Sequence, residues 1–173
     1  MESIFGEYLV KFNKDAQSMP AVDGEQPSPY TKLSLEDSLL ASDCQNIAVF
    51  FTADYAPPCA TFLASFIAFC NEANKDPTKK RFEVVVVNCD RTEAEYRTHI
   101  AKMPLSWFNV PFEATKTMEK LEDIAHASTI PRVAILSRLR PEEPLLADIK
   151  PIVLKSPNMD AAVKELMDKL SHL

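Results

Sequence analysis

The chain has 173 residues, 46% of them hydrophobic, and a net charge of −6 from 19 basic and 25 acidic side chains. That length suits one domain with a real core, and the absence of any basic block excludes an electrostatic nucleic-acid footprint. No apolar run approaches the roughly 18 residues that a membrane-spanning helix needs, so we expect no membrane insertion.

The N-terminal segment and the cysteine usage indicate where the protein works. MESIFGEYLVKF contains Glu2 and Glu7, which argues against a secretory signal and against an acid-poor transit peptide. The cysteines are Cys44, Cys59, Cys70 and Cys89. Four are too few for a disulfide scaffold in a chain of this length. We therefore expect an intracellular protein in a reducing compartment, cytoplasmic by default, with organelle import by another route left open.

The first 35 residues predict an extension followed by an edge strand. Residues 2–12 favour a short helix, residues 13–29 read as a loop, and residues 30–35 predict a short edge strand. The side chains expected to face inward from the first helix are Ile4, Phe5, Leu9 and Val10. We expect residues 1–29 to form an N-terminal helix-and-loop extension, and residues 30–173 to form the domain with its C-terminal helix.

Continuous apolar runs predict the central strands. The runs at 46–53, 81–89 and 131–137 are typical of strands that are covered on both faces. The second run contains four consecutive valines, which favour strand over helix. Residues 145–154 are expected to hold the last strand.

Apolar residues at helical spacing predict four helices between and after these strands. Their ranges are 58–73, 91–103, 115–128 and 158–173. Thr92 and Glu95 have the spacing of a capping box, and Asn158 is a suitable N-cap. Buried strands that alternate with helices indicate an α/β layered domain with a largely parallel centre.

Three separated segments resemble one known family. VFFTADYAPPCATF resembles the Trp-Cys-Pro-Pro-Cys segment of thioredoxin-fold proteins, in the version of tryparedoxins and nucleoredoxins. FEVVVVNCDRTEAEYRTHIAKMPLSWFNVPFEA resembles the family segment with the Lys-Met-Pro and Val-Pro-Phe motifs, and STIPRVAIL resembles the segment around the family's cis-proline. The resemblance covers about residues 30–155. It implies a thioredoxin fold, in which a mixed, largely parallel sheet is flanked by helices, and it places Pro131 in the cis-proline role.

The resemblance also implies that the active site is degenerate. The family attacks a partner's disulfide with an exposed first cysteine and resolves the mixed disulfide with a second one. Here Ala56 occupies the first position, where the nucleophile is lost, and Cys59 is the remaining resolving cysteine. Tyr55 stands where the family has tryptophan, and Ala60 and Thr61 stand where tryparedoxins commonly have Arg-Gly. Cys59 is therefore expected to be shielded one turn into its helix.

Two functions from different classes follow. The first is a non-catalytic binding or structural subunit of a larger assembly, with one or more protein partners. The second is a thiol-disulfide oxidoreductase that uses Cys59 alone or with Cys89, which ends a central strand on the active-site side. Cys70 lies roughly 16 Å from Cys59 along the same helix, too far for a disulfide. Cys44 is expected to be a surface or loop thiol without a role.

The resemblance further implies a groove that binds an extended peptide by strand addition, which needs no thiol. Its expected lining is Tyr55, Ala56, Pro57, Pro58, Ile130, Pro131 and Trp107. For Trp107 the alternative is a core aromatic residue.

No metal or cofactor site is expected. The histidines His99, His126 and His172 are scattered and read as surface or helix residues. A chain with only two glycines can hardly supply a phosphate-binding loop.

Overall fold

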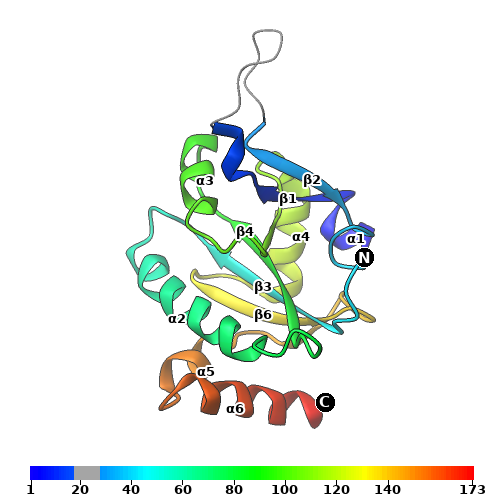
Figure 1. Cartoon of the computed structure of the whole chain (residues 1–173), viewed down its shortest axis with the longest axis vertical. Coiled ribbons are helices and arrows are strands. Elements are labelled where there is room, and N and C mark those ends of the chain that lie inside the picture. The colour runs from blue at the N-terminus through cyan, green and yellow to red at the C-terminus, as the bar shows by residue number, and fades with distance from the viewer. Residues whose placement is uncertain (18–27) are drawn as a thin grey trace, which may run out of the picture.

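A seven-stranded open sheet forms the centre of the computed structural model, which describes residues 1–17 and 28–173. Across this sheet the strand order is β2-β1-β5-β4-β3-β6-β7 (Figure 1). In chain order the strands are β1 (Tyr8–Phe12), β2 (Tyr30–Ser34), β3 (Asn46–Thr52), β4 (Phe82–Asn88), β5 (Phe108–Asn109), β6 (Arg132–Ser137) and β7 (Pro144–Leu146). The helices are α1 (Glu2–Phe5), the 3₁₀ turn η1 (Lys14–Gln17), α2 (Pro57–Ala73), α3 (Glu93–Ile100), α4 (Thr115–Ala125), α5 (Lys150–Lys155) and α6 (Met159–Ser171).

The middle of the sheet is parallel and its flanks are antiparallel. Strand β4 pairs in parallel with β3 and β5, whereas β6 runs antiparallel to β3, and β1 runs antiparallel to β5 and β2. Every residue of β4 is buried. The expected α/β architecture with a mixed, largely parallel sheet is therefore confirmed, as are the three continuous apolar strands.

Each face of the sheet has its own core. Val84 and Val86 of β4 point to the face covered by α2, α5 and α6, and Val85 and Val87 point to the face covered by α1 and α4 (Figure 1). Because successive side chains of a strand alternate between faces, one valine run supplies both layers. Burial on both faces explains why the run shows no polar alternation.

The N-terminal segment differs from the expected helix over residues 2–12. Helix α1 ends at Gly6, whose φ of 78° lies in the left-handed region, and an added Cβ there would lie 3.0 Å from Thr117 Oγ1 of α4. Residues 8–12 then pair with β2 and β5 as a strand. The apolar residues expected to face inward are all buried: Ile4, Phe5, Leu9 and Val10.

Because β1 belongs to the central sheet, part of the extension expected at residues 1–29 is a strand of the domain's central layer. The boundary between extension and domain at residue 29 stays a prediction. Most of the loop expected at 13–29 lies outside the described residues, and η1 occupies its first part.

The segment expected to hold the last strand divides into a strand and a helix. The strand β7 ends at Leu146, and α5 begins at Lys150. Asp148 Oδ1 accepts the backbone N–H of Lys150 at 2.9 Å, and Pro151 stands in the first turn, where its missing N–H costs little. The apolar run 152–154 therefore continues as helix rather than strand. Strand β5, with two residues, was not expected.

The helix starts that the sequence predicted are confirmed. Thr92 Oγ1 accepts the Glu95 N–H at 3.2 Å, and Glu95 Oε2 accepts the Thr92 N–H at 3.1 Å, which completes the capping box of α3. Asn158 Oδ1 accepts the Ala161 N–H at 2.9 Å and caps α6.

Candidate functional site

The start of α2 is an exposed turn between β3 and the helix. Ala56 is the N-cap and offers no side-chain hydrogen bond, while Pro57 and Pro58 form the first turn. The prolines remove two of the backbone donors that a helix start leaves unpaired, and the Cys59 N–H donates to the Ala56 carbonyl at 2.9 Å. A side-chain cap is therefore not needed here. Tyr55 is 49% exposed, and the guanidinium of Arg91 lies over its ring at 4.9 Å.

Cys59 lies one turn inside α2 and is fully buried, with 0% of its surface exposed. The expected shielding of this thiol is confirmed. A buried thiol in an apolar setting meets no substrate disulfide and behaves as a small hydrophobic residue.

A cis peptide bond joins Ile130 to Pro131, the position that the resemblance assigned to the cis-proline. The register pairs Arg132 with Phe51, so the loop before β6 and the loop after β3 lie at the same edge of the sheet. Pro131 is buried and Ile130 is half-buried. The fold thus brings the cis-proline loop and the α2 start to one edge, and a groove between them stays a prediction.

Trp107 does not belong to that groove. It is buried, and its ring lies 5.3 Å from the ring of Phe66 and 6.2 Å from the ring of Phe50. The indole packs under α2 among these aromatic rings. The expected groove role is wrong for this residue, and the alternative, a core aromatic residue, is confirmed.

The other cysteines are poor nucleophiles. Cys44 lies in the loop before β3, as one of the two expected alternatives had it, but it is buried in the core and not at the surface. Its Sγ donates to the Asn46 carbonyl at 3.4 Å. Burial raises the pKa of both Cys44 and Cys70. Cys89 is half-buried just after β4, with its Sγ 3.9 Å from Glu122 Oε1. Burial first, and then the charge of Glu122 and the nearby Cys59 thiol, raise the pKa of Cys89 to about 12.

His99 lies on α3, so the expected helix position is confirmed, but its side chain is not at the surface. The side chain is only 2% exposed, so the surface alternative is wrong for this histidine. Its Nδ1 lies 3.0 Å from Asp90 Oδ2 and 3.2 Å from Asn88 Nδ2, and its Nε2 lies 3.5 Å from Thr52 Oγ1. Burial lowers the pKa of His99, while the hydrogen bond and charge of Asp90 oppose that shift. His126 and His172 are exposed, as expected.

A helical pattern in the sequence could have revealed this burial. Tyr96, His99, Ile100 and Met103 have the i, i+3, i+4, i+7 spacing of one buried helix face, and all four are buried. The partners of His99 could not be found in this way, since Thr52 is 47 residues away.

The connection Thr52–His99–Asp90 has the order of a hydrolase triad but cannot act as one. Thr52 is fully buried in β3, so no substrate carbonyl reaches its hydroxyl. What the arrangement can do is hold backbone: Asp90 Oδ1 accepts the Asp54 N–H at 2.8 Å, in the loop that leads to Ala56. The network therefore fixes the approach to the α2 start.

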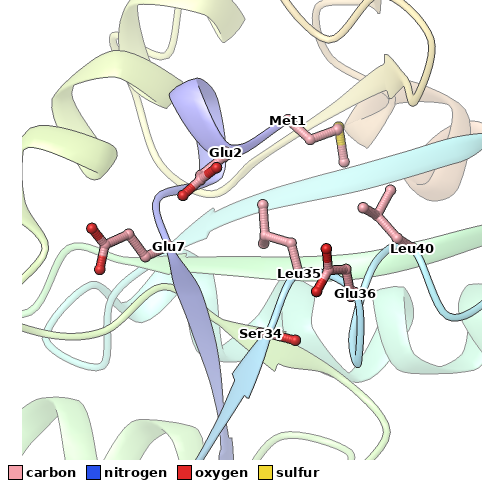
Figure 2. Close-up of a pocket in the computed structure, with 7 residues that line it drawn as sticks. All are labelled: Met1, Glu2, Glu7, Ser34, Leu35, Glu36 and Leu40. Atoms are coloured by element: carbon pink, nitrogen blue, oxygen red, sulfur yellow. The ribbon is translucent and has the colours of Figure 1, made fainter.

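A separate pocket of about 170 Å³ contains none of these residues. Figure 2 shows its lining, which comes from α1 and its N-cap, the residue before β1, and the end of β2 with the turn that follows: Met1, Glu2, Glu7, Ser34, Leu35, Glu36 and Leu40.

Over residues 1–17 and 28–173, no group of three or more His, Cys, Asp or Glu side chains is arranged to hold a metal ion. Among the helices of the same ranges, none has the length and apolar character that crossing a membrane requires.

Comparisons with known proteins agree with this architecture. The chain is 30% identical over 100 residues to Probable nucleoredoxin 1 of Arabidopsis thaliana, covering 58% of this chain and 16% of that protein. It is 25% identical over 103 residues to nucleoredoxin of Homo sapiens, covering 60% of this chain and 22% of that protein. The chain thus spans less than a quarter of the length of these relatives.

Solved structures show the same fold. Tryparedoxin II from C. fasciculata superposes with a TM-score of 0.65 at 23% identity, over 90% of this chain and 87% of that one. Tryparedoxin from Trypanosoma brucei gives 0.59 at 23% identity, over 74% and 82% of the two chains.

The profile of the family described as Thioredoxin-like matches residues 45–139, which is more than half of the chain. These residues run from β3 through β6 and include both the α2 start and the cis-proline loop. The chain has the thioredoxin fold in its tryparedoxin- and nucleoredoxin-like form, and it belongs to the thioredoxin-like family.

Proposed function

We propose that this chain is a tryparedoxin-like protein that has lost the dithiol reaction and serves as a non-catalytic binding or structural subunit of a larger assembly. One observation carries the proposal. At the exposed start of α2, where the family's attacking thiol would stand, the side chain is the methyl group of Ala56, and the remaining Cys59 is fully buried.

The chemistry of thiol exchange supports this reading. Exchange needs a thiolate that reaches the partner's disulfide, and a second thiol that resolves the mixed disulfide. Cys59 is shielded from a partner, and it cannot close a disulfide with Ala56. With a pKa of about 12, Cys89 is almost entirely protonated at neutral pH and is a weak substitute.

The surface at the α2 start supports a binding role. Tyr55, Pro57 and Pro58 are exposed, and Ile130 of the cis-proline loop is half-buried. Arg91 steadies the Tyr55 ring by a cation–π contact, so an aromatic side chain is held out toward solvent. An extended segment of a protein partner could pair with the backbone before Pro131 without any thiol. An intracellular, reducing compartment is part of the proposal, since all four cysteines are free.

The second candidate is a thiol-disulfide oxidoreductase that works through Cys59, alone or with Cys89. One observation favours it: the Cys89 N–H donates to the Thr52 carbonyl at 2.8 Å, which places Cys89 beside the end of β3, at the edge where α2 begins. This candidate needs Cys59 to become exposed during turnover.

A turnover assay separates the two candidates. Wild-type protein and Cys59→Ser are compared in insulin reduction and in reduction of a mixed disulfide with glutathione, with Cys70→Ser as a buried-cysteine control. The proposal expects no turnover in any of the three, and no alkylation of Cys59 in the folded protein over hours. Turnover in wild type that disappears in Cys59→Ser alone would overturn it.

A partner test addresses the binding role. Native protein is isolated with its associated proteins, and these are identified by mass spectrometry. Tyr55→Ala should lose the main partner, whereas Leu139→Ala, which removes another exposed apolar side chain beyond the far end of β6, should keep it. Equal retention by both variants would contradict a binding face at the α2 start.

A further inference from the structure

A buried polar network joins three elements next to the loop at residues 53–56. It consists of Thr52 at the end of β3, Asn88 and Asp90 at and after the end of β4, and His99 on α3, all of them buried. The imidazole contacts the other three side chains. The network is therefore the point at which two strand ends and a helix are held together.

One carboxylate in this network serves both the histidine and the loop. Asp90 Oδ2 faces His99 Nδ1, and Asp90 Oδ1 accepts the backbone N–H of Asp54. The Asp54 side chain forms an ion pair with Lys102, in the turn after α3. Two contacts from the α3 side thus hold the loop that leads into Tyr55 and Ala56.

A neutral imidazole satisfies its contacts with both Asp90 and Thr52, although the Asn88 amide nitrogen at 3.2 Å then finds no acceptor on Nδ1. Nδ1–H donates to Asp90, which leaves Nε2 as an acceptor for the Thr52 hydroxyl. The amide oxygen of Asn88 is occupied by the Asp90 N–H at 2.8 Å. A second proton on Nε2 would meet only the Thr52 hydroxyl oxygen and would create a cation in a place that solvent does not reach.

The charged groups that face His99 are Asp90 after β4, Asp54 after β3, and Lys102 after α3. Burial lowers the pKa of His99 more than the two carboxylates raise it, and Lys102 adds to the lowering. The folded state then binds fewer protons than the unfolded state. The stability from neutral His99 is complete above about pH 6.5 and is lost as the pH falls through the range below it.

We propose that His99 and Asp90 form a pH-sensitive latch on the loop at residues 53–56. Protonation favours a state in which the imidazole turns toward water, Asp90 loses its contact with His99, and the Asp54 amide is released. The latch would regulate the binding surface at Tyr55 and so rests on the proposed function for its biological use.

Amide hydrogen exchange of the full chain, followed by NMR between pH 7.5 and 5.0, tests the latch. After correction for intrinsic exchange, the protection factor of the Asp54 amide should fall at least tenfold. The midpoint should coincide with the titration of the His99 ring, and the Val85 amide in the centre of β4 should keep its protection. An Asp54 amide equally protected at both pH values would overturn the proposal, and this arm needs no variant.

Two histidine variants sharpen the assignment. His99→Asn keeps an N–H donor near the Nδ1 position but cannot titrate, so its Asp54 protection should not change with pH. His126→Asn removes an exposed histidine and should retain the wild-type response. The same pH response in His99→Asn as in wild type would overturn the assignment to His99.

The test is independent of the proposed function because it needs neither a partner nor a thiol. A failed latch would leave the binding role standing. Conversely, thiol turnover through Cys59 would overturn the binding role without changing the Asp54 measurement.

Discussion

Helices α2 and α3 both begin at one edge of the sheet, directly after the neighbouring parallel strands β3 and β4, but their starts are built differently. The α3 start is closed by a reciprocal capping box between Thr92 and Glu95. The α2 start has no side-chain cap, and two prolines replace donors that would otherwise need one.

The two helix starts show that a side-chain cap stabilises a helix, whereas its absence leaves the N-cap residue available for contacts outside the helix. A capped start uses its free N–H groups for its own helix, while an uncapped start leaves its first residue free to present a side chain to a partner. In this chain the uncapped start presents an alanine and an exposed tyrosine. Of the buried polar groups nearby, Asp90 accepts the Asp54 backbone N–H, and His99 contacts the Asp90 carboxylate. This edge of the sheet therefore combines a loop held by buried polar groups with an N-cap, Ala56, that carries no reactive group.

The largest expected effect comes from returning a thiol to the α2 start. Ala56→Cys places a thiol at the half-buried N-cap of α2, with two residues between it and Cys59. We therefore expect a fast-reacting thiol and insulin reduction at least tenfold above wild type. Ala60→Cys is the matched control, since it adds an exposed thiol at a spacing that gives no Cys-x-x-Cys pair. If the two variants show the same turnover, the frame around α2 no longer supports the reaction.

The next largest effect tests the buried polar network of Asp90 and His99 beside the α2 start. Asp90→Ala removes the acceptor of both the Asp54 N–H and His99, and it should lower the free energy of unfolding by about 3 kcal/mol. Urea denaturation measures the change. Asp123→Ala, at an exposed position of α4, should stay within about 0.5 kcal/mol of wild type. Equal losses would mean that the buried network adds nothing to stability.

A smaller effect compares the two helix starts directly. Thr92→Ala should cost about 1 kcal/mol, because the Glu95 N–H loses its partner. Ala56→Ser should gain no more than a few tenths of a kcal/mol, below the usual N-cap gain of about 1 kcal/mol. The reason is that Pro57 and Pro58 have no N–H, and the Cys59 N–H is already bonded. A full gain in denaturation midpoint for Ala56→Ser would contradict the view that the α2 start needs no cap.

The smallest effect concerns the exposed ion pair that links the loop to α3. Lys102→Ala should cost about 0.5 kcal/mol at low salt, and less in 1 M NaCl, because the pair is half exposed and screened. Lys155→Ala, at an exposed position of α5, serves as the control. A loss that does not depend on salt would assign the effect to packing of the lysine stem rather than to charge.

The sequence predicted the central elements well because their signals are local. Four valines in a row can pack on two faces only as a buried strand, and the spacing of Thr92 and Glu95 marks a helix start without help from the rest of the chain. The elements that it missed depend on distant partners. Residues 8–12 become a strand because β2 and β5 lie beside them, and α5 begins where Asp148 accepts the Lys150 N–H.

The contrast between local signals and distant contacts also applies to the candidate site. The burial of Cys59 follows from its place one turn into a helix, and the cis-proline follows from the family pattern. The contacts of His99 could not be predicted, because they join residues from β3, β4 and α3 that only the folded sheet brings together. For Trp107 the family resemblance was misleading. The motif predicted that this residue lines the peptide groove, whereas its ring packs in the core against Phe66.

The position of Trp107 gives the protein a built-in optical probe. It is the single tryptophan of the chain, and its indole is buried between Phe50 and Phe66 directly under α2. Its intrinsic fluorescence should therefore be blue-shifted in the native state and should move to the red when water enters the layer between α2 and the sheet. Unlabelled protein can report on the integrity of the core beneath the α2 start, at concentrations far below those that NMR requires.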